Sequence, residues 1–298
     1  MQLSLTTVTY NHHAEIAPCL RAVLAAAGQW QAEIIVVDNA STDDTIKIVR
    51  EIRQANQNER FTIQLVPLPT NTGFTHATNI GLQRSRGAFL MLLNPDTRVT
   101  PTALSQLMDY LQANPEVGLV APQLLNPDGS IQPSCRRFPR RSDVVWHLFG
   151  FNAICPKSKI FNHWKMGDFS HQYLAEVDQP QGAALMTTRQ ALEDVGLLDE
   201  QFPMFFSDVD WCRRFKERGW KIVYYSEARI IHQKGTSIQR KRVPMIWSSH
   251  QSFFRYFRKY RPGLVNRFLN WGVGGLLFFT AGIRIIVIYF RNLVKHKK

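Results

Sequence analysis

The sequence predicts an α/β fold with a mostly parallel central sheet, followed by a helical C-terminal region. Short apolar segments alternate with helical ones in the first half of the chain, which is typical of a parallel sheet with right-handed crossovers. Five consecutive apolar residues at 89–93 indicate a strand that is buried on both faces. Residues 228–298 contain 15 Lys or Arg and no Asp or Glu, which sets the end of the chain apart.

Three predicted strands of the first half are each followed by a predicted helix. In chain order, the ranges of strand and helix are 3–10 with 11–27, 33–38 with 44–54, and 62–66 with 73–81. Asn11 is the expected N-cap of the first helix, Pro18 falls in its first turn, and Gly28 closes it. Gly73 and Gly81 bracket the third helix, whose first-turn amides are placed to face a phosphate.

The second half of the chain has a weaker pattern. The predicted elements are a helix at 101–114, strands at 118–122 and 181–187, helices at 189–195 and 208–218, and strands at 221–225 and 228–232. Between 126 and 175 the periodicity is weak, which predicts a functional loop region rather than core.

The basic tail combines charge with long apolar stretches. Residues 245–260 carry aromatic and basic side chains at helical spacing, and 268–290 is an apolar run of 23 residues interrupted by Asn270 and Arg284. That length is enough either to cross a bilayer or to lie in its interface. Because the first 227 residues carry 21 basic and 23 acidic groups, the net charge of +13 comes from the tail. The tail therefore predicts an anionic partner, membrane lipid or nucleic acid, and the apolar run favours lipid.

The cysteines and the N-terminus indicate a reducing, cytoplasmic environment. The four cysteines show neither metal-type spacing nor a dense disulfide framework, which suits a reducing environment. The segment beginning at Met1 lacks the basic start and long apolar core of a signal peptide. We therefore expect the N-terminal body to remain in the cytoplasm.

Three carboxylates follow or precede predicted elements in positions suited to chemistry. Asp96 comes just after the buried strand 89–93, at the end of a strand where α/β proteins bind ligands, although an Asp beside a proline is also an ordinary turn residue. Asp38 ends the strand 33–38, and its alternative role is helix capping. Asp208 stands at the start of a helix and could equally cap it.

Five segments together give these residues a context. They are Val8-Thr-Tyr-Asn11, Val37-Asp-Asn-Ala-Ser-Thr-Asp43, Asn71-Thr-Gly-Phe74 with Asn79 and Gly81, Leu93-Asn-Pro-Asp96, and Ser207-Asp-Val-Asp210 with His232. In order and spacing they resemble the family 2 glycosyltransferases, enzymes of the GT-A fold that use nucleotide-sugar donors. The resemblance covers roughly residues 1–235 and is close to the rhamnosyltransferase-like branch of bacterial surface polysaccharide synthesis.

The resemblance implies a role for each motif residue. The donor-binding residues it implies are Thr9, Tyr10, Asn11, Asp38, Asn71, Gly73, Asn79, Asn94 and Asp96. It implies Asp208 as the catalytic base, with Gly182 and Asp210 toward the acceptor, although Asp210 has the alternative of orienting its helix. Asp96 and His232 are the implied ligands of a divalent cation, Mg²⁺ or Mn²⁺, and a structural histidine is the alternative for His232.

The chain departs from the family pattern at two positions. Asn94 stands where the family has the first carboxylate of an Asp-any-Asp pair, so it offers an amide oxygen without charge, and Ser207 stands where the family usually has Glu. Asp38 is expected to accept the imide N–H that uracil and thymine share, so a UDP or a dTDP donor fits. Arg136 and Arg137 are further candidates for contacting a diphosphate, with a solvated charged face as the alternative.

These expectations combine into one function. We expect a metal-dependent inverting glycosyltransferase that transfers rhamnose from dTDP-rhamnose to a lipid-linked or growing glycan at the cytoplasmic face of the membrane. The expected domains are a catalytic domain at 1–235, with a nucleotide-binding half at 1–98 and an acceptor half at 99–235, and a membrane-associating region at 236–298. The rivals are a UDP-hexose transferase of the same fold, an inactive membrane-bound scaffold and a nucleic-acid-binding protein.

Overall fold

The computed structural model describes residues 1–27, 30–56, 60–233 and 242–295. The chain forms two compact units. The first, which we call the sheet unit, comprises Met1–Phe138, Phe169–Pro203 and Ser207–Lys234. The second, which we call the helical unit, comprises Pro139–Asp168, Met204–Phe206 and Gly235–Lys298. The boundary expected at residue 235 placed 139–168 in the catalytic domain, whereas this segment clusters with the tail helices.

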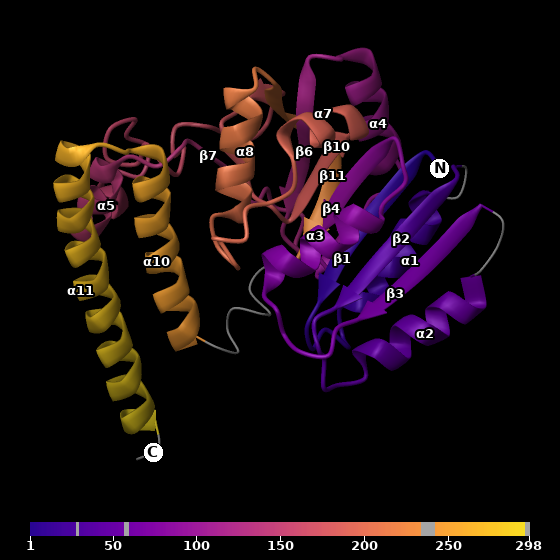
Figure 1. Cartoon of the computed structure of the whole chain (residues 1–298), viewed down its shortest axis with the longest axis horizontal. Helices are drawn as coiled ribbons and strands as arrows, with labels where there is room; N and C mark the ends of the chain where they lie inside the picture. The colour runs from indigo at the N-terminus through magenta and orange to yellow at the C-terminus, as the bar shows by residue number, and fades with distance from the viewer. Residues whose placement is uncertain (28–29, 57–59, 234–241, 296–298) are drawn as a thin grey trace. The chain divides into compact units, whose positions relative to one another are not determined.

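The sheet unit is built on a nine-stranded sheet with the order β3-β2-β1-β4-β10-β6-β11-β5, and β8 pairs with β11. The strands are β1 Leu3–Thr9, β2 Ala32–Asp38, β3 Phe61–Pro67, β4 Phe89–Leu93, β5 Thr97–Val99, β6 Val117–Leu125, β8 Ala175–Glu176, β10 Ala184–Thr188 and β11 Lys221–His232. The strands β3, β2, β1 and β4 run parallel, as do β6 and β11, whereas β10, β5 and β8 are antiparallel to their neighbours. The mostly parallel α/β sheet predicted from the sequence is confirmed (Figure 1).

Helices cover both faces of this sheet. The helices of the sheet unit are α1 Ile16–Ala26, α2 Thr45–Asn56, α3 Phe74–Arg84, α4 Ala103–Ala113, α7 Arg189–Val195 and α8 Ser207–Glu217. Successive residues of a strand point to opposite faces, so Ile34 and Val36 join the core with α1, α2 and α4. Ile35 and Val37 face the other way and pack with Ala77 of α3. Strands that are apolar on both faces follow from this double cover.

Several boundaries differ from those expected. The helix α1 begins at Ile16 rather than after Asn11, because Asn11 adopts a left-handed conformation with φ 58° and starts a loop. The expected closing residue Gly28 lies outside the described residues. The helix α3 continues past Gly81 to Arg84. A Cβ at Gly81 would lie 2.2 Å from Thr6 Cγ2, so the glycine permits close packing of α3 on β1 instead of ending the helix.

Two further expectations change in the second half of the chain. The strands expected at 221–225 and 228–232 are one strand, β11, with a register shift against β6 between Tyr225 and Arg229. The region 126–175 is not wholly loop. It contains β7 Cys135–Arg136, which pairs with β9 Gln179–Pro180, and the helices α5 Arg141–Leu148 and α6 Phe151–Ile154.

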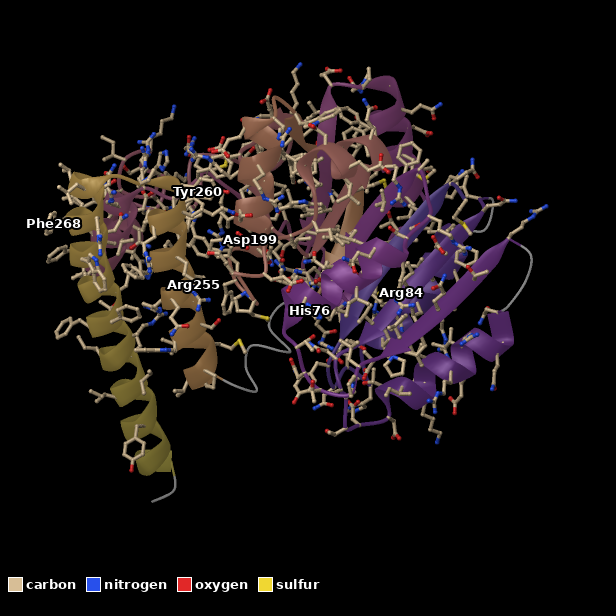
Figure 2. All side chains as sticks on the ribbon, viewed as in Figure 1. His76, Arg84, Asp199, Arg255, Tyr260 and Phe268 are labelled. Atoms are coloured by element: carbon tan, nitrogen blue, oxygen red, sulfur yellow. The ribbon has the colours of Figure 1, made fainter. Side chains whose placement is uncertain are left out.

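The helical unit contains two long helices, α10 Arg242–Tyr260 and α11 Leu264–Lys295, which run side by side (Figure 1). Aromatic pairs hold them together: the ring centroids of Trp247 and Phe278 are 5.1 Å apart, and those of Phe254 and Trp271 are 5.4 Å apart. The stretch Leu264–Ile286, with a mean hydropathy of 1.4, is long and apolar enough to cross a membrane. Figure 2 shows Phe268 projecting from α11 on the side away from α10, and this side chain is 71% exposed.

Candidate active site

The C-terminal ends of β1, β2 and β4 lie side by side at one edge of the sheet, because these strands are parallel neighbours. Thr9 ends β1 and pairs in register with Asp38, which ends β2. The turn of residues 94–96 directly follows β4. Neighbouring strands lie about 4.8 Å apart, so Asp38 and this turn are separated by roughly two strand spacings. The sequence prediction that both belong to one ligand-binding edge fits this topology.

Asp38 organises the loop that follows its own strand. The Asp38 carboxylate accepts hydrogen bonds from Thr9 Oγ1 at 2.9 Å, from Ser41 N at 2.9 Å and from Ser41 Oγ at 2.5 Å. The residue has no exposed surface. A base can therefore reach this carboxylate only if the Ser41 loop moves, so direct contact between Asp38 and a nucleotide base stays a prediction.

The first two motifs are joined to each other through Asn11. Its backbone N–H donates to Ser41 Oγ at 2.9 Å, and its Oδ1 accepts the Thr42 N–H at 2.8 Å. The left-handed φ of 58° at Asn11 turns the chain to make this contact, and asparagine tolerates that conformation well. Next to it, the Tyr10 N–H donates to His12 Nδ1 at 3.0 Å. The half-buried Tyr10 and Asn11 thus lie at the rim of the edge.

The third motif joins the same edge through another asparagine pair. Asn39 Nδ2 donates to Asn71 Oδ1 at 3.0 Å, and the Gly73 N–H donates to the same oxygen at 3.1 Å. Gly73 has φ 89°, a conformation that L side chains rarely adopt, and a Cβ there would lie 3.1 Å from Pro203 O. The glycine is thus required by the backbone where α3 begins.

Asn79 is used differently from the prediction. Its Nδ2 donates to Leu198 O at 2.9 Å and to Glu200 Oε1 at 3.0 Å, while its Oδ1 accepts the Leu198 N–H at 3.0 Å. The residue is 5% exposed. These bonds tie α3 to the loop after α7, which is a structural role, and a contact of Asn79 with the donor stays a prediction.

Asp96 and His232 come together at the end of β11, although 136 positions separate them in the sequence. His232 Nε2 lies 3.5 Å from Asp96 Oδ1, and both side chains are less than 10% exposed. His232 Nδ1 lies 2.7 Å from Gln132 Oε1. Gln132 Nε2 donates to Asn126 Oδ1 at 2.8 Å, so the glutamine turns its oxygen toward the histidine. The Gln132 oxygen makes Nδ1 the hydrogen-bond donor of the ring, and Nε2 is the nitrogen that faces Asp96.

These two groups fit a divalent cation that also binds phosphate. Mg²⁺ is usually held by one or two carboxylates together with phosphate oxygens, and an imidazole whose other nitrogen donates a hydrogen bond is a favoured metal ligand. Among the described residues no cluster of three or more His, Cys, Asp or Glu is available for a metal. A cation at Asp96 and His232 would therefore depend on oxygens of the donor to complete its coordination.

Asp208 lies in the first turn of α8 and is held by the segment before β10. Its Oδ2 accepts the Gly182 N–H at 3.0 Å and Gln179 Nε2 at 3.2 Å. A Cβ on Gly182 would lie 3.1 Å from Asp208 Cβ, so glycine allows the close approach. Burial raises the pKa of Asp208, and the backbone hydrogen bonds and the charge of Arg136 only partly oppose it. A carboxylate with a raised pKa is a better general base.

Asp208 and the turn of residues 94–96 are close in the fold because β4 and β10 are neighbours. The Asn94 N–H donates to Ala183 O at 2.8 Å, and Ala183 follows the glycine that holds Asp208. Arg136 adds a positive charge beside Asp208. Burial lowers the pKa of Arg136, and the charge of Asp208 raises it, so the two groups stabilise each other's charged forms. The candidate base, the candidate metal ligands and one arginine thus gather at one edge of the sheet unit.

Asp210 does not have the position expected of an acceptor ligand. Its side chain has no exposed surface, and its Oδ2 accepts Arg214 Nε at 2.9 Å. Arg214 in turn donates to Val195 O and Leu197 O, each at 2.7 Å. Of the two roles considered for Asp210, the structure favours orientation of α8. A helix start carrying two carboxylates gives no indication in sequence of which one is buried.

Four further polar residues of this edge were not singled out from the sequence. They are Asn39, Ser41, Gln132 and Gln179. Ser41 and Asn39 lie inside the recognised second motif, so the motif itself was a signal for them. Gln132 lies within the region of weak periodicity at 126–175 and Gln179 lies just after it, and nothing in the sequence marks them.

Comparisons with known proteins agree on the family. A model described as "Glycosyltransferase like family 2" matches residues 2–250. The N-acetylglucosaminyl-diphospho-decaprenol L-rhamnosyltransferase of Mycobacterium tuberculosis is 26% identical, over 95% of this chain and 92% of its own. A low-salt glycan biosynthesis hexosyltransferase of Haloferax volcanii is 21% identical, over 90% of this chain and 74% of its own.

Solved structures show the same fold. The mannosyltransferase PcManGT from Pyrobaculum calidifontis, in complex with GDP-Man and Mn²⁺, has a TM-score of 0.60 at 17% identity, and covers 98% of this chain and 80% of that one. Staphylococcus aureus TarS in complex with UDP has a TM-score of 0.53 at 15% identity, with coverage of 88% and 67%. Because the family model spans most of the sequence and the sheet has the GT-A arrangement, this chain belongs to glycosyltransferase family 2 and is a nucleotide-sugar-dependent transferase.

Proposed function

We propose that this enzyme is an inverting glycosyltransferase that moves rhamnose from dTDP-rhamnose to a lipid-linked or growing polysaccharide. The observation that carries the proposal is that Gly182, which holds Asp208, is followed by Ala183, which bonds the turn of residues 94–96, with His232 beside Asp96. The rhamnosyltransferase of Mycobacterium tuberculosis, which aligns over 95% of the chain, supports the choice of sugar and of a lipid diphosphate acceptor. The proposed catalytic domain is 1–235, with the donor in the 1–98 half.

The donor's diphosphate is the leaving group, and its charge must be balanced as the sugar bond breaks. Asp96 and His232 would hold a divalent cation, with Asn94 offering an uncharged amide oxygen beside them. Such a cation supplies electrostatic stabilisation to the departing diphosphate. Gln132 keeps the His232 ring in the tautomer that can bind it.

Asp208 would remove the proton from the acceptor hydroxyl as that oxygen attacks the anomeric carbon. The raised pKa of this carboxylate strengthens it as a base. Gly182 and Gln179 donate to Oδ2, and the Val209 N–H donates to Oδ1 at 2.9 Å, so the orientation of the carboxylate is fixed. Attack opposite the leaving diphosphate would invert the anomeric configuration.

The same geometry would serve the rival UDP-hexose transferase, because the Asp38 carboxylate, once the Ser41 loop moves, would accept the imide N–H that uracil and thymine share. The complex of TarS with UDP is a reason to keep this rival. The dTDP-rhamnose and UDP-hexose proposals differ in the nucleotide that should stabilise the protein more. With a dTDP donor, dTDP should raise the melting temperature of the protein more than UDP does at equal concentration.

The helical unit would keep the enzyme at the cytoplasmic face of the membrane, where a lipid-linked acceptor is found. The exposed apolar side chains along α11, among them Phe268 and Leu264, support association with lipid. The absence of acidic residues beyond 227 adds attraction to an anionic leaflet.

The proposal is tested by incubating the purified chain with membrane extract and a panel of nucleotide sugars, followed by mass measurement of the lipid products. We expect a mass increase of one deoxyhexose with dTDP-rhamnose in the presence of Mg²⁺ or Mn²⁺, and none with Asp208→Asn. Transfer of a hexose from a UDP donor would favour the rival. Absence of any transfer or donor hydrolysis would indicate an inactive scaffold.

A further inference from the structure

We propose that a pocket at the turn between α10 and α11 binds the phosphate group of an anionic membrane lipid. The proposal rests on the membrane association proposed above, and it is independent of the sugar, the donor nucleotide and the transfer chemistry. Nothing in the active-site edge contributes to it, because all of its residues belong to the helical unit.

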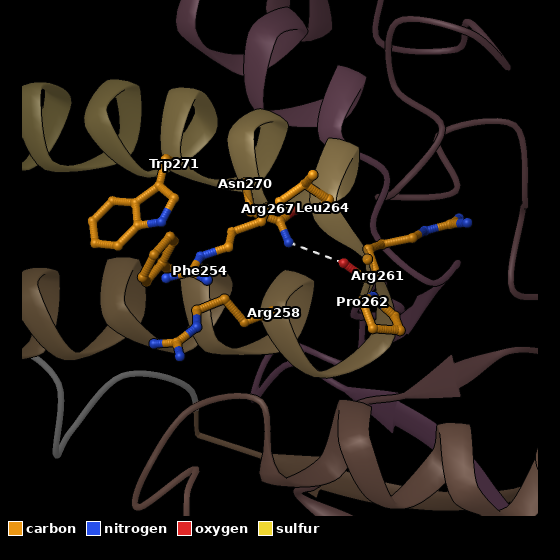
Figure 3. Close-up of a pocket in the computed structure, with 9 residues that line it drawn as sticks. Phe254, Arg258, Arg261, Pro262, Leu264, Arg267, Asn270 and Trp271 are labelled. Atoms are coloured by element: carbon orange, nitrogen blue, oxygen red, sulfur yellow. Dashed lines mark hydrogen bonds between the residues drawn. The ribbon is translucent and has the colours of Figure 1, made fainter.

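The pocket is a cavity of about 460 Å³ formed where the two helices meet. Three arginines line it, Arg258 from α10, Arg261 from the turn and Arg267 from α11. Phe254 and Trp271 close one side of it (Figure 3). Gly263 makes the turn possible, since its φ of 99° is unfavourable for other residues. Asn270 Nδ2 donates to Phe257 O and Arg261 O, each at 3.1 Å, which fixes the start of α11 against the end of α10.

The positive charge of this pocket is not balanced by an ion pair in the described part of the unit. None of the three arginines forms an ion pair with a described carboxylate, and the guanidinium of Arg258 lies 5.8 Å from the Phe254 ring centroid. A fourth arginine, Arg141, is satisfied by amide oxygens of Asn266 and Asn270, which are neutral. Burial, and after it the charge of Arg261, lower the pKa of Arg141, so the two cations repel each other. An anion would relieve this repulsion.

A phosphate suits this set of groups better than a chloride ion. Guanidinium groups form paired hydrogen bonds with phosphate oxygens, and Arg258 and Arg267 both extend to the side of the pocket where Phe254 lies (Figure 3). A halide ion has no pair of oxygen atoms to accept two such hydrogen bonds side by side.

The surroundings indicate that this phosphate is carried by a lipid. Leu264 is 72% exposed and Trp271 is 59% exposed, so apolar side chains flank the arginines. The pocket is also at the N-terminal end of the apolar stretch Leu264–Ile286. A helix that enters the acyl region over this stretch places its first turn at the level of the head groups, where Trp and Arg side chains are favoured. A free phosphate would need none of these apolar neighbours.

The test compares binding of the full-length protein to vesicles of phosphatidylcholine alone and to vesicles that also contain phosphatidylglycerol, at constant salt. The measured quantity is the ratio of the two partition coefficients, which cancels the apolar contribution of α11. We expect Arg267→Gln to lower this ratio roughly tenfold or more, because charge-assisted hydrogen bonds are lost. The control Lys259→Gln removes one charge from the same end of α10, outside the pocket, and should lower it about fivefold or less.

Arg267→Lys distinguishes a specific phosphate site from general charge attraction, because lysine keeps the positive charge and loses the paired N–H donors of the guanidinium. A ratio well below that of the unmodified protein supports the pocket. A ratio equal to it, or equal losses for Arg267→Gln and Lys259→Gln, overturns the proposal and leaves general charge attraction. The last measurement adds inorganic phosphate. If it abolishes the preference for phosphatidylglycerol and stabilises the protein as much as the vesicles do, the pocket binds free phosphate and the lipid is refuted. Equal binding to both vesicles refutes the pocket alone, whereas binding to neither refutes membrane association as well.

Discussion

Replacing Gln132 with alanine should weaken metal binding through a residue that does not itself bind the metal. Gln132 is 2% exposed and accepts the His232 Nδ1 hydrogen bond at 2.7 Å. Without it, His232 can adopt the other tautomer and turn its N–H toward Asp96. Loss of such a partner typically lowers metal affinity 10–100-fold, so we expect the Mn²⁺ dissociation constant to rise by about that factor. In molecules whose ring keeps the proton on Nδ1, that buried donor has lost its partner, which should cost ~1–3 kcal/mol of unfolding free energy.

The assay is Mn²⁺ titration calorimetry in the presence of dTDP, together with urea unfolding of the same samples. The matched control is Gln123→Ala, another buried glutamine of the sheet unit, whose Nε2 donates to His171 O at 2.7 Å. That carbonyl also accepts the Tyr224 hydroxyl, so the control should lose only about 1 kcal/mol and no metal affinity. Unchanged Mn²⁺ affinity in Gln132→Ala, or an equal loss in both variants, would refute the positioning role.

Four other outcomes follow from the structure. Asp208→Asn should reduce kcat about 10²–10⁴-fold, as measured by product formation, and activity of the unmodified enzyme should rise with pH through the raised pKa of Asp208. Because that pKa is raised in the folded state, the charged carboxylate costs stability as pH rises above the unfolded value, and urea titrations should show this dependence disappearing in Asp208→Asn. Asp210→Ala should cost about 3 kcal/mol in urea unfolding because Arg214 loses its buried partner, with no change in KM for the acceptor; a raised KM would restore the acceptor role. Gly81→Ala should cost roughly 1–3 kcal/mol, since its Cβ meets Thr6, and a melting temperature equal to that of the unmodified protein would contradict the packing. Iodoacetamide should modify the half-buried Cys155 in the native protein before Cys19, whose pKa is raised to about 12 by burial, and mass spectrometry of the peptides would reveal the opposite order.

The parallel half of the sheet was accessible from the sequence because its strands are apolar on both faces and alternate with capped helices. The positions of Asp96, Asp38 and Asp208 near strand or helix ends followed from the same pattern. The burial of Asp210 did not, because its partner Arg214, one helical turn away, is itself held by carbonyls of another loop. The use of Asn79 did not either, because its partners lie at 198–200. The role of Gln132 was equally hidden, since the contact with His232 spans 100 positions.

The hydrogen bond from the Asn94 N–H to Ala183 O has a consequence for how this enzyme tolerates change. The turn of residues 94–96 and Gly182, which holds the proposed base Asp208, are registered against each other by the ladder between β4 and β10. Lengthening of the surface segments within 139–168, which contain none of the site residues described above, is therefore expected to leave the spacing of the reacting groups unchanged. Diversification of glycan specificity in such a scaffold is then expected to proceed by insertion in that region, with the strand pair left intact.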